Sequence, residues 1–268
     1  MSKGFLWFAQ NNNTTDYARL SIELARSIRQ HNKSHAICVI TDRHTKLQSE
    51  YIDSIIVLDH DNSEKETIKF SNEYQAFSLS PFTHTIKLEA DMLWTSNTEW
   101  WWYYLCQHNM IFSVNCRNYK DEIIRHTPYR QLFEKNYLPN IYSGMFYFRK
   151  SKIAQQFFKL CESITHNWKT IRDECLIACH DSVPTTDVVY SLALRIMDPT
   201  SETLIDYPWF KFIHSKPAVN RIEIAQQQYN YLYPIKLKDR IYLGGHRLDR
   251  VWHYYEKDIP EVLDARVF

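Results

Sequence analysis

Two acidic side chains at alternate positions, Glu89 and Asp91, are the clearest candidates for chemistry in this sequence. They lie in the run Lys87-Leu88-Glu89-Ala90-Asp91-Met92, next to a β-rich segment. Residues i and i+2 of a strand point the same way, with Cα atoms roughly 6.5–7 Å apart. Both carboxylates are therefore expected to project together from the carboxyl end of a strand. Two such oxygens suit a hard divalent cation that keeps other positions for phosphates and water.

A structural interpretation competes with the metal site. Apolar and polar residues alternate along this segment, with one face formed by Ile86, Leu88, Ala90 and Met92 and the other by Lys87, Glu89 and Asp91. A half-buried strand explains that alternation without a metal, and the spacing alone favours it. The spacing disfavours a glycosidase, because the two carboxyl groups of a glycosidase work from opposite sides of the scissile bond.

Glycine usage narrows the classes of nucleotide-binding protein. The 268 residues include only four glycines, Gly4, Gly144, Gly244 and Gly245. A P-loop, a dinucleotide-binding fingerprint and a kinase phosphate loop all need closely spaced glycines, because only glycine lets the backbone close on a phosphate. A nucleotide bound here must have its diphosphate held by a metal or by side chains. The formal net charge of +1 argues against a wholly basic nucleic-acid coat protein.

Short apolar runs and amphipathic segments predict an α/β fold. We expect strands at 5–9, 36–41, 54–58, 85–89, 110–115, 145–149, 209–214, 240–243 and 250–254, and helices at 17–31, 71–79, 153–164 and 186–197. The first ninety residues alternate strand and helix, which is typical of a parallel sheet with right-handed crossovers. The less regular second half indicates one asymmetric sheet in a single domain. Ligands of such sheets bind beyond the carboxyl ends of the strands.

Five segments resemble, in order, the motifs of the glycogenin-type glycosyltransferases of the GT-A fold. They are Asn13–Arg19 continuing to Ser27–His31, Ser78–Asp91, Ile141–Phe146, Thr186-Asp187 and Val251–Tyr254. The resemblance covers most of the chain. It implies a GT-A-like, Rossmann-type mixed sheet flanked by helices, with residues 1–92 binding the nucleotide-sugar and residues 93–268 binding the acceptor. It also implies a transfer that retains the anomeric configuration.

The resemblance implies a metal site and a donor site. Mn²⁺ or Mg²⁺ is expected to bind Glu89, Asp91 and His253 together with the diphosphate of a UDP-sugar. His214 is the alternative histidine, because His214-Ser215-Lys216-Pro217 is a second, compressed match to the family's late motif. Glu89 replaces the usual aspartate, and the helix before the acidic motif lacks the family's lysine. These departures support a second hypothesis, a catalytically silent relative that only binds a nucleotide, a sugar or a nucleic acid.

The remaining site residues follow from the same resemblance. Thr14, Asp16 and Tyr17 lie in the loop that is expected to hold the nucleotide, and Ser143 and Gly144 are expected beside the sugar. The ammonium group of Lys257 or Lys216 would lie beside the leaving phosphate as a positive point charge. Asp187 would hydrogen-bond hydroxyls of the sugar or the acceptor. A structural role explains each of two residues as well: Tyr17 as an aromatic of the core and Asp187 as a helix cap.

The acceptor is the least constrained expectation. The closing run Val251–Asp258 resembles that of phage-encoded glycosyltransferases, which implies DNA carrying a hydroxymethylated pyrimidine. Residues 211–250 carry a net charge of +5, from eight bases (Lys211, Lys216, Arg221, Lys236, Lys238, Arg240, Arg247 and Arg250) and three acids (Glu223, Asp239 and Asp249). Such a band can track phosphates. A solvated basic face on an enzyme that acts on a glycan or a protein explains it equally well.

Three smaller features complete the expectations. The run Trp100–Tyr104 could stack on sugars or bases, although such runs more often form core. Cys175, Cys179 and His180 lack a second ligand pair for zinc, so a buried helix face is the better interpretation. The least charged stretch, 100–116, is interrupted by polar residues and does not resemble a membrane span. We therefore expect a protein of the cytoplasm, or of the host cytoplasm if it is phage-encoded, with no membrane partner.

Overall fold

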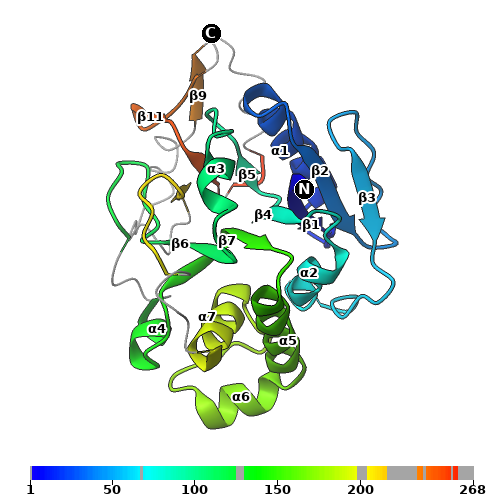
Figure 1. Ribbon diagram of the computed structural model, residues 1–268, viewed down its shortest axis with the longest axis vertical. Coiled ribbons are helices and arrows are strands. Elements are labelled where there is room, and N and C mark those ends of the chain that lie inside the picture. The colour runs from blue at the N-terminus through cyan, green and yellow to red at the C-terminus, as the bar shows by residue number, and fades with distance from the viewer. Residues whose placement is uncertain are drawn as a thin grey trace.

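The first strand, β1 (Lys3–Ala9), lies inside a six-stranded sheet of order β3-β2-β1-β4-β7-β6 in this computed structural model (Figure 1). The other strands of this sheet are β2 (Ala36–Thr41), β3 (Ser54–Val57), β4 (His84–Leu88), β6 (Met110–Val114) and β7 (Ile141–Arg149). Strands β1 to β4 pair in parallel, whereas β7 runs antiparallel to both β4 and β6. The structure describes residues 2–66, 69–124, 130–197, 204–215, 234–237, 240–254 and 256–258.

Helices cover both faces of this sheet. Phe5 and Trp7 of β1 belong to a core shared with α1 (Tyr17–His31) and α3 (Trp101–Leu105). Leu6 and Phe8 point to the opposite face, where the core includes residues of α2 (Ala76–Leu79), α5 (Lys152–His166) and α7 (Thr186–Met197). The short helices α4 (Gln131–Lys135) and α6 (Trp168–Cys175) complete the helical elements, and α5, α6 and α7 lie together at the bottom of Figure 1. The chain is a single α/β domain with a mixed sheet flanked by helices.

A small second sheet brings distant segments together. It has the order β5-β12-β8, formed by Met92–Leu93, Val251–His253 and Phe212–His214. His253 pairs with Met92 on the antiparallel side and with His214 on the parallel side. A further three-stranded sheet consists of β9 (Pro234–Leu237), β10 (Arg240–Leu243) and β11 (His246–Leu248). The β5–β12 pairing places a segment from beyond residue 250 beside the acidic run.

Most of the expected elements are present, and two expectations are wrong. The helix predicted at 71–79 is a short 3₁₀ turn, Glu73–Gln75, followed by α2. Strand β4 is buried along its whole length rather than on one face, because it lies between β1 and β7 with helices above and below. Lys87, assigned to a polar face, is 0% exposed and forms an ion pair with Glu73. No helix among the described residues combines the length and apolar character that a membrane crossing requires.

The buried Lys87–Glu73 pair generates a stability prediction. Lys87→Met should lower the free energy of unfolding by about 3–5 kcal/mol, because it leaves the Glu73 carboxylate buried without its cation. Burial already raises the pKa of Glu73, and Lys87 opposes that rise. The variant should therefore regain stability as the pH falls through the raised folded-state pKa of Glu73 and on below the ordinary glutamate pKa, where Glu73 is protonated in both the folded and unfolded states.

Urea unfolding at several pH values measures this effect. The double variant Lys87→Met/Glu73→Met should recover most of the loss, because it removes both charges together. Lys169→Met is the matched control, since Lys169 forms an exposed pair with Asp173 on α6, and it should leave the unfolding midpoint unchanged. An equal loss in the control would contradict the importance of burial.

Candidate metal centre

The acidic run forms the turn that connects the central sheet to the small sheet. Strand β4 ends at Leu88, and β5 begins at Met92, so Glu89 and Asp91 lie between two buried strands. The Tyr254 backbone N–H donates to the Asp91 carbonyl over 3.2 Å and ties this turn to the segment after β12. Neither acid is therefore on a free loop.

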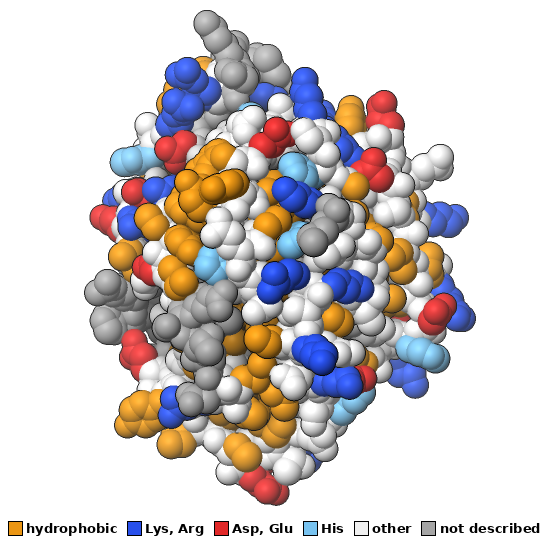
Figure 2. Space-filling view, in the orientation of Figure 1, with side chains coloured by type: hydrophobic (Ala, Val, Ile, Leu, Met, Phe, Trp, Pro, Cys, Tyr) orange, Lys and Arg blue, Asp and Glu red, His pale blue; other side chains and the backbone are white. Residues whose placement is uncertain are grey.

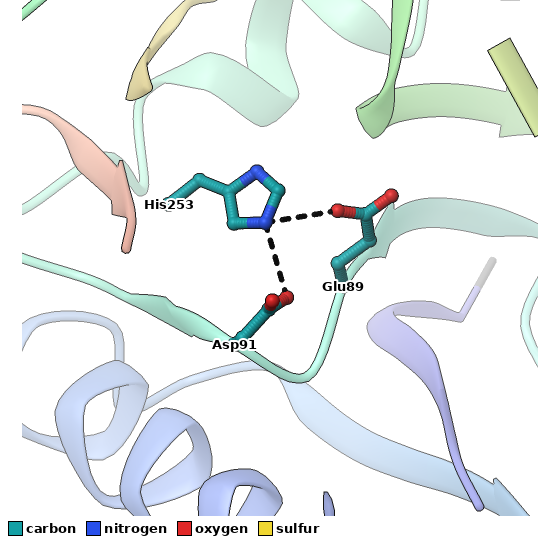
Figure 3. Close-up of side chains that lie close together, drawn as sticks. All are labelled: Glu89, Asp91 and His253. Atoms are coloured by element: carbon teal, nitrogen blue, oxygen red, sulfur yellow. Dashed lines mark ion pairs between the residues drawn. The ribbon is translucent and has the colours of Figure 1, made fainter. Parts of the chain in front are cut away.

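Three side chains converge at this turn (Figure 3). His253 Nε2 lies 3.2 Å from Glu89 Oε2 and 3.2 Å from Asp91 Oδ1. Their candidate ligand atoms all lie within 4.8 Å of one another, and no other such group of acids, histidines and cysteines occurs among the described residues. His253 and Asp91 are buried, whereas the Glu89 side chain is 23% exposed. Two carboxylates and one imidazole thus share a volume that a single cation can fill, and Glu89 faces the solvent side.

The structure distinguishes the two candidate histidines. Both ring nitrogens of His253 are buried, and neither has a hydrogen-bond partner among the described residues. His214 stacks beside it with ring centroids 4.5 Å apart and does not belong to the three-residue group. The two rings thus differ in position: the Nε2 atom of His253 faces both carboxylates and fits a metal ligand, whereas His214 packs against the ring of that ligand.

Lys257 is a cation in direct contact with the cluster. Its ammonium forms an ion pair with Asp91 Oδ2. Arg19 of α1 donates to the Lys257 carbonyl over 2.7 Å, which holds this segment against the helix. Lys257 Nζ also lies 5.9 Å from the centroid of the Tyr17 ring. The lysine predicted from sequence is thus at the site, while Lys216 lies outside the described residues.

A cavity of about 270 Å³ opens beside the cluster, near the lower end of the size range of small-molecule sites. Its lining includes Gln10, Asn12 and Tyr17 from the loop after β1, together with Asp91 and Lys257. Burial, and then the charges of Asp91 and Glu89, raise the pKa of Tyr17, so its phenol stays neutral beside the two acids. A neutral aromatic ring, and a lysine that is paired with Asp91, therefore line a hollow at the carboxyl end of the sheet together with the two carboxylates.

The loop residues differ from expectation in detail. Thr14 and Asp16 are not among the residues that line the cavity. Thr14 hydrogen-bonds Asn12, and Asp16 caps α1 by accepting from the Arg19 backbone N–H. Gln10, also in the lining, is held by hydrogen bonds to Asp42, Asp61 and Asn72. Of the loop chosen from sequence, the residues at the cavity are thus Gln10, Asn12 and Tyr17.

Three lining residues carried no sequence signal. Lys69, Phe70 and Glu73 come from the segment before α2, which connects β3 to β4. Nothing in their types or spacing marks them as site residues, and only the folded path of the chain brings them to the cavity. The Cys175, Cys179 and His180 grouping forms no metal cluster among the described residues. The buried helix face expected for it is wrong, because α6 ends at Cys175, both Cys175 and His180 are exposed, and Cys179 is only partly buried.

Ser143 and Gly144 of β7, expected beside the sugar, are not among the residues that line the cavity. A Cβ on Gly144 would lie 3.3 Å from Glu89 Oε2 and 3.0 Å from Met92 Cε. The close approaches that favour a glycine here are thus to Met92 first and to Glu89 next. Ser143 donates its backbone N–H and its hydroxyl to Asp187 Oδ1, over 2.7 and 2.6 Å. Asp187 Oδ2 accepts from Arg130 over 2.7 Å, so both oxygens of Asp187 hold neighbouring protein groups.

The basic band is weaker as a phosphate-binding surface than its charge count suggests. Lys211 is buried and paired with Asp206. Arg250 lies 3.4 Å from Asp121 and 3.8 Å from Asp249, which balance its charge. Three further bases of the band, Lys216, Arg221 and Lys238, lie outside the described residues. The exposed described bases include Arg240 and Arg247 on β10 and β11.

Comparison with models of known protein families finds no match for this chain, and no curated protein matches it. The functional interpretation therefore depends on the geometry of the cluster and on the ordered motifs.

The packing at Gly144 generates a second stability prediction. Gly144→Ala should lower the free energy of unfolding by about 1–3 kcal/mol, because the new methyl group overpacks the space between Met92 and Glu89. Met92→Leu removes the nearest atom and should cost less than about 1.5 kcal/mol alone. In the Met92→Leu background, Gly144→Ala should therefore cost less, and a double-mutant cycle by urea unfolding measures the coupling. Strict additivity would show that Met92 does not limit the space.

Proposed function

We propose that this protein is a metal-dependent glycosyltransferase that moves a sugar from a nucleotide-sugar, a UDP-sugar, to an acceptor hydroxyl. The observation that carries the proposal is the convergence of Glu89, Asp91 and His253 at the edge of a cavity on the carboxyl side of the sheet. This is where a doubly wound sheet binds its ligand. The ordered GT-A-like motifs agree with it, because they place the same three residues at the metal.

The donor set suits a divalent cation. Carboxylate oxygens are preferred by Mg²⁺ and Mn²⁺, and an imidazole nitrogen favours the softer Mn²⁺ over Mg²⁺. Three protein ligands leave positions for diphosphate oxygens and water. When bound, the ion would stabilise the negative charge that develops on the leaving diphosphate as a Lewis acid. The open side of Glu89 faces the cavity from which that diphosphate would approach.

Lys257 and Tyr17 complete the donor site in this proposal. The Lys257 ammonium, held at Asp91 and anchored by Arg19, is positioned to neutralise the leaving phosphate as a point charge. Tyr17 offers its neutral ring to the base, while the fixed amide of Gln10 and the side chain of Asn12 supply polar contacts. These residues bind and orient the donor, and the cavity excludes part of the water around it.

Asp187 acts in this proposal as a positioning residue. Its carboxylate fixes the backbone of Ser143 and the guanidinium of Arg130, and Ser143 precedes the glycine that packs on Glu89. Asp187 therefore sets the position of β7 relative to the metal ligands.

The DNA acceptor expected from sequence stays a prediction, because Lys211 and Arg250 are paired with acids and three other bases of the band are not described.

The metal site is tested by Mn²⁺ binding. Electron paramagnetic resonance of free Mn²⁺ should show a site in the wild type that His253→Phe weakens by well over tenfold, since even an outer-shell partner of a metal ligand typically contributes roughly 10–100-fold. His214→Phe should have a much smaller effect, because phenylalanine keeps the ring packing and His214 is outside the cluster. A larger loss in His214→Phe would transfer the ligand role to His214.

Catalysis is tested by nucleotide release. With Mn²⁺ present, a screen of UDP-sugars should identify a donor from which the protein releases UDP. Asp91→Asn should reduce that rate by about 10²–10³-fold, the range for the loss of one electrostatic stabiliser of a transition state. Asp173→Asn, which changes an exposed acid on α6, should keep the wild-type rate. Binding of UDP and Mn²⁺ without release from any donor would instead identify the catalytically silent relative.

A further inference from the structure

An exposed aromatic surface lies around α3, which the proposed glycosyl transfer does not use. Trp100, Tyr103 and Tyr104 are 48%, 72% and 44% exposed. Figure 2 shows hydrophobic side chains gathered over α3 on this face of the molecule. Clustered exposed rings are costly to leave in water, and large apolar patches of this kind usually mark a binding surface.

Part of this surface is a pocket of about 420 Å³ with aromatic walls. The Trp100 and Trp209 rings meet with centroids 5.1 Å apart and an angle of 57° between their planes. Trp101, which is buried, supports Trp209 from behind at 5.7 Å and 48°. Two tilted indoles and a buried third thus line a pocket within the size range of small-molecule sites, roughly 300–1,000 Å³.

Apart from Pro208, the rest of the pocket wall is polar. Asn97, Asp249 and Arg250 contribute an amide, a carboxylate and a guanidinium. The Asp249 side chain is 65% exposed, and Asn97 Oδ1 accepts from the Glu99 backbone N–H over 3.0 Å. Hydrogen-bond donors and acceptors thus stand beside an aromatic platform, with Asp249 and Arg250 adjacent in the chain.

We propose that this pocket binds a pyranose ring of a neutral, glucose-like oligosaccharide. The C–H face of such a ring carries partial positive charge and packs on the electron-rich face of an indole. Neighbouring hydroxyls both donate and accept, so they match a carboxylate beside a guanidinium. The charges disfavour a single-stranded nucleic acid, since Arg250 is balanced by Asp121 and Asp249 and a phosphate would meet the Asp249 carboxylate.

The pocket is connected to the acidic cluster through one strand pair. Arg250 precedes β12 by one residue and His253 ends it, while the Thr95 hydroxyl donates to the Arg250 carbonyl just after β5. Three residues of strand span about 10 Å. Arg250, in the pocket lining, therefore lies about 10 Å along the chain from His253. The binding itself requires neither the metal nor the donor, so it stands apart from the proposed transferase activity.

Isothermal titration calorimetry with maltohexaose and with cellohexaose, in EDTA and without any nucleotide-sugar, tests the pocket. At least one of the two should bind with a Kd of about 1 mM or tighter, and the one that binds identifies the linkage. Trp100→Ala should weaken binding about tenfold or more, and Asp249→Asn several-fold. Tyr103→Ala is the matched control, because Tyr103 is an exposed ring of the same helix that is not part of the pocket lining, and it should bind as the wild type does.

Two further variants keep the result interpretable. Circular dichroism and thermal unfolding show whether Trp100→Ala is folded. If Trp100→Ala is not folded, Asp249→Asn still tests the pocket, because it leaves the packing of the rings untouched. Asp91→Ala should keep full glycan affinity, so a failure of the transferase proposal does not affect this one. The inference is overturned if neither hexaose binds, if Asp91→Ala abolishes binding, or if Tyr103→Ala weakens it as much as Trp100→Ala. Salt-sensitive binding of oligothymidylate that depends on Trp100, with no glucan binding, would assign the pocket to nucleic acid instead.

Discussion

Two carboxylates that lie close together repel each other, and the candidate site is organised around that repulsion. At the 4.8 Å limit of the Glu89–Asp91–His253 group, two unit charges repel by about 3 kcal/mol at an effective dielectric constant of about 20. Lys257 balances Asp91, and the neutral phenol of Tyr17 adds no charge to the site. A divalent cation would balance both acids at once. Lys87, two residues before Glu89, balances the charge of another buried acid, Glu73, with no ligand involved.

Strand pairing rather than sequence proximity holds these charges in place. Glu89 and Asp91 lie directly after β4, and the two-residue β5 follows them. β12 pairs with β5 and places His253 beside the two acids. β8 supports β12 on its other side and places His214 behind His253. Because β5, β8 and β12 have only two or three residues each, the site depends on their packing against the central sheet more than on their own hydrogen bonds.

Local patterns predicted much of this fold. Apolar runs and one helical face located β1, β2, α1 and α7, and the acidic pair marked the end of β4. The three clustered side chains followed from an ordered set of weak motifs, which fixed residue types and order along the chain. The choice between His253 and His214 needed coordinates, because both histidines end strands of the same small sheet.

The remainder depends on information that a local pattern does not hold. The alternation of residues in β4 indicated a half-buried strand. However, a strand that lies between two others, with helices on both faces of the sheet, buries its polar residues as well. The buried Lys87 therefore needs an acidic partner, which comes from 14 residues earlier in the chain. β5 is too short to show any periodicity. Lys69 and Phe70 reach the cavity only through the path of a connecting segment. In each case the deciding factor was which neighbours the topology supplies.

The ion pair between Lys257 and Asp91 joins residues 166 positions apart. On a ribosome, the acids of the turn emerge long before the histidine and lysine that balance them. The central sheet up to β7 can assemble while those acids still face water, and their partners arrive only with the closing of a long loop, which is a slow and entropically costly step. The charged centre is therefore expected to form last in folding, on a scaffold that is already in place.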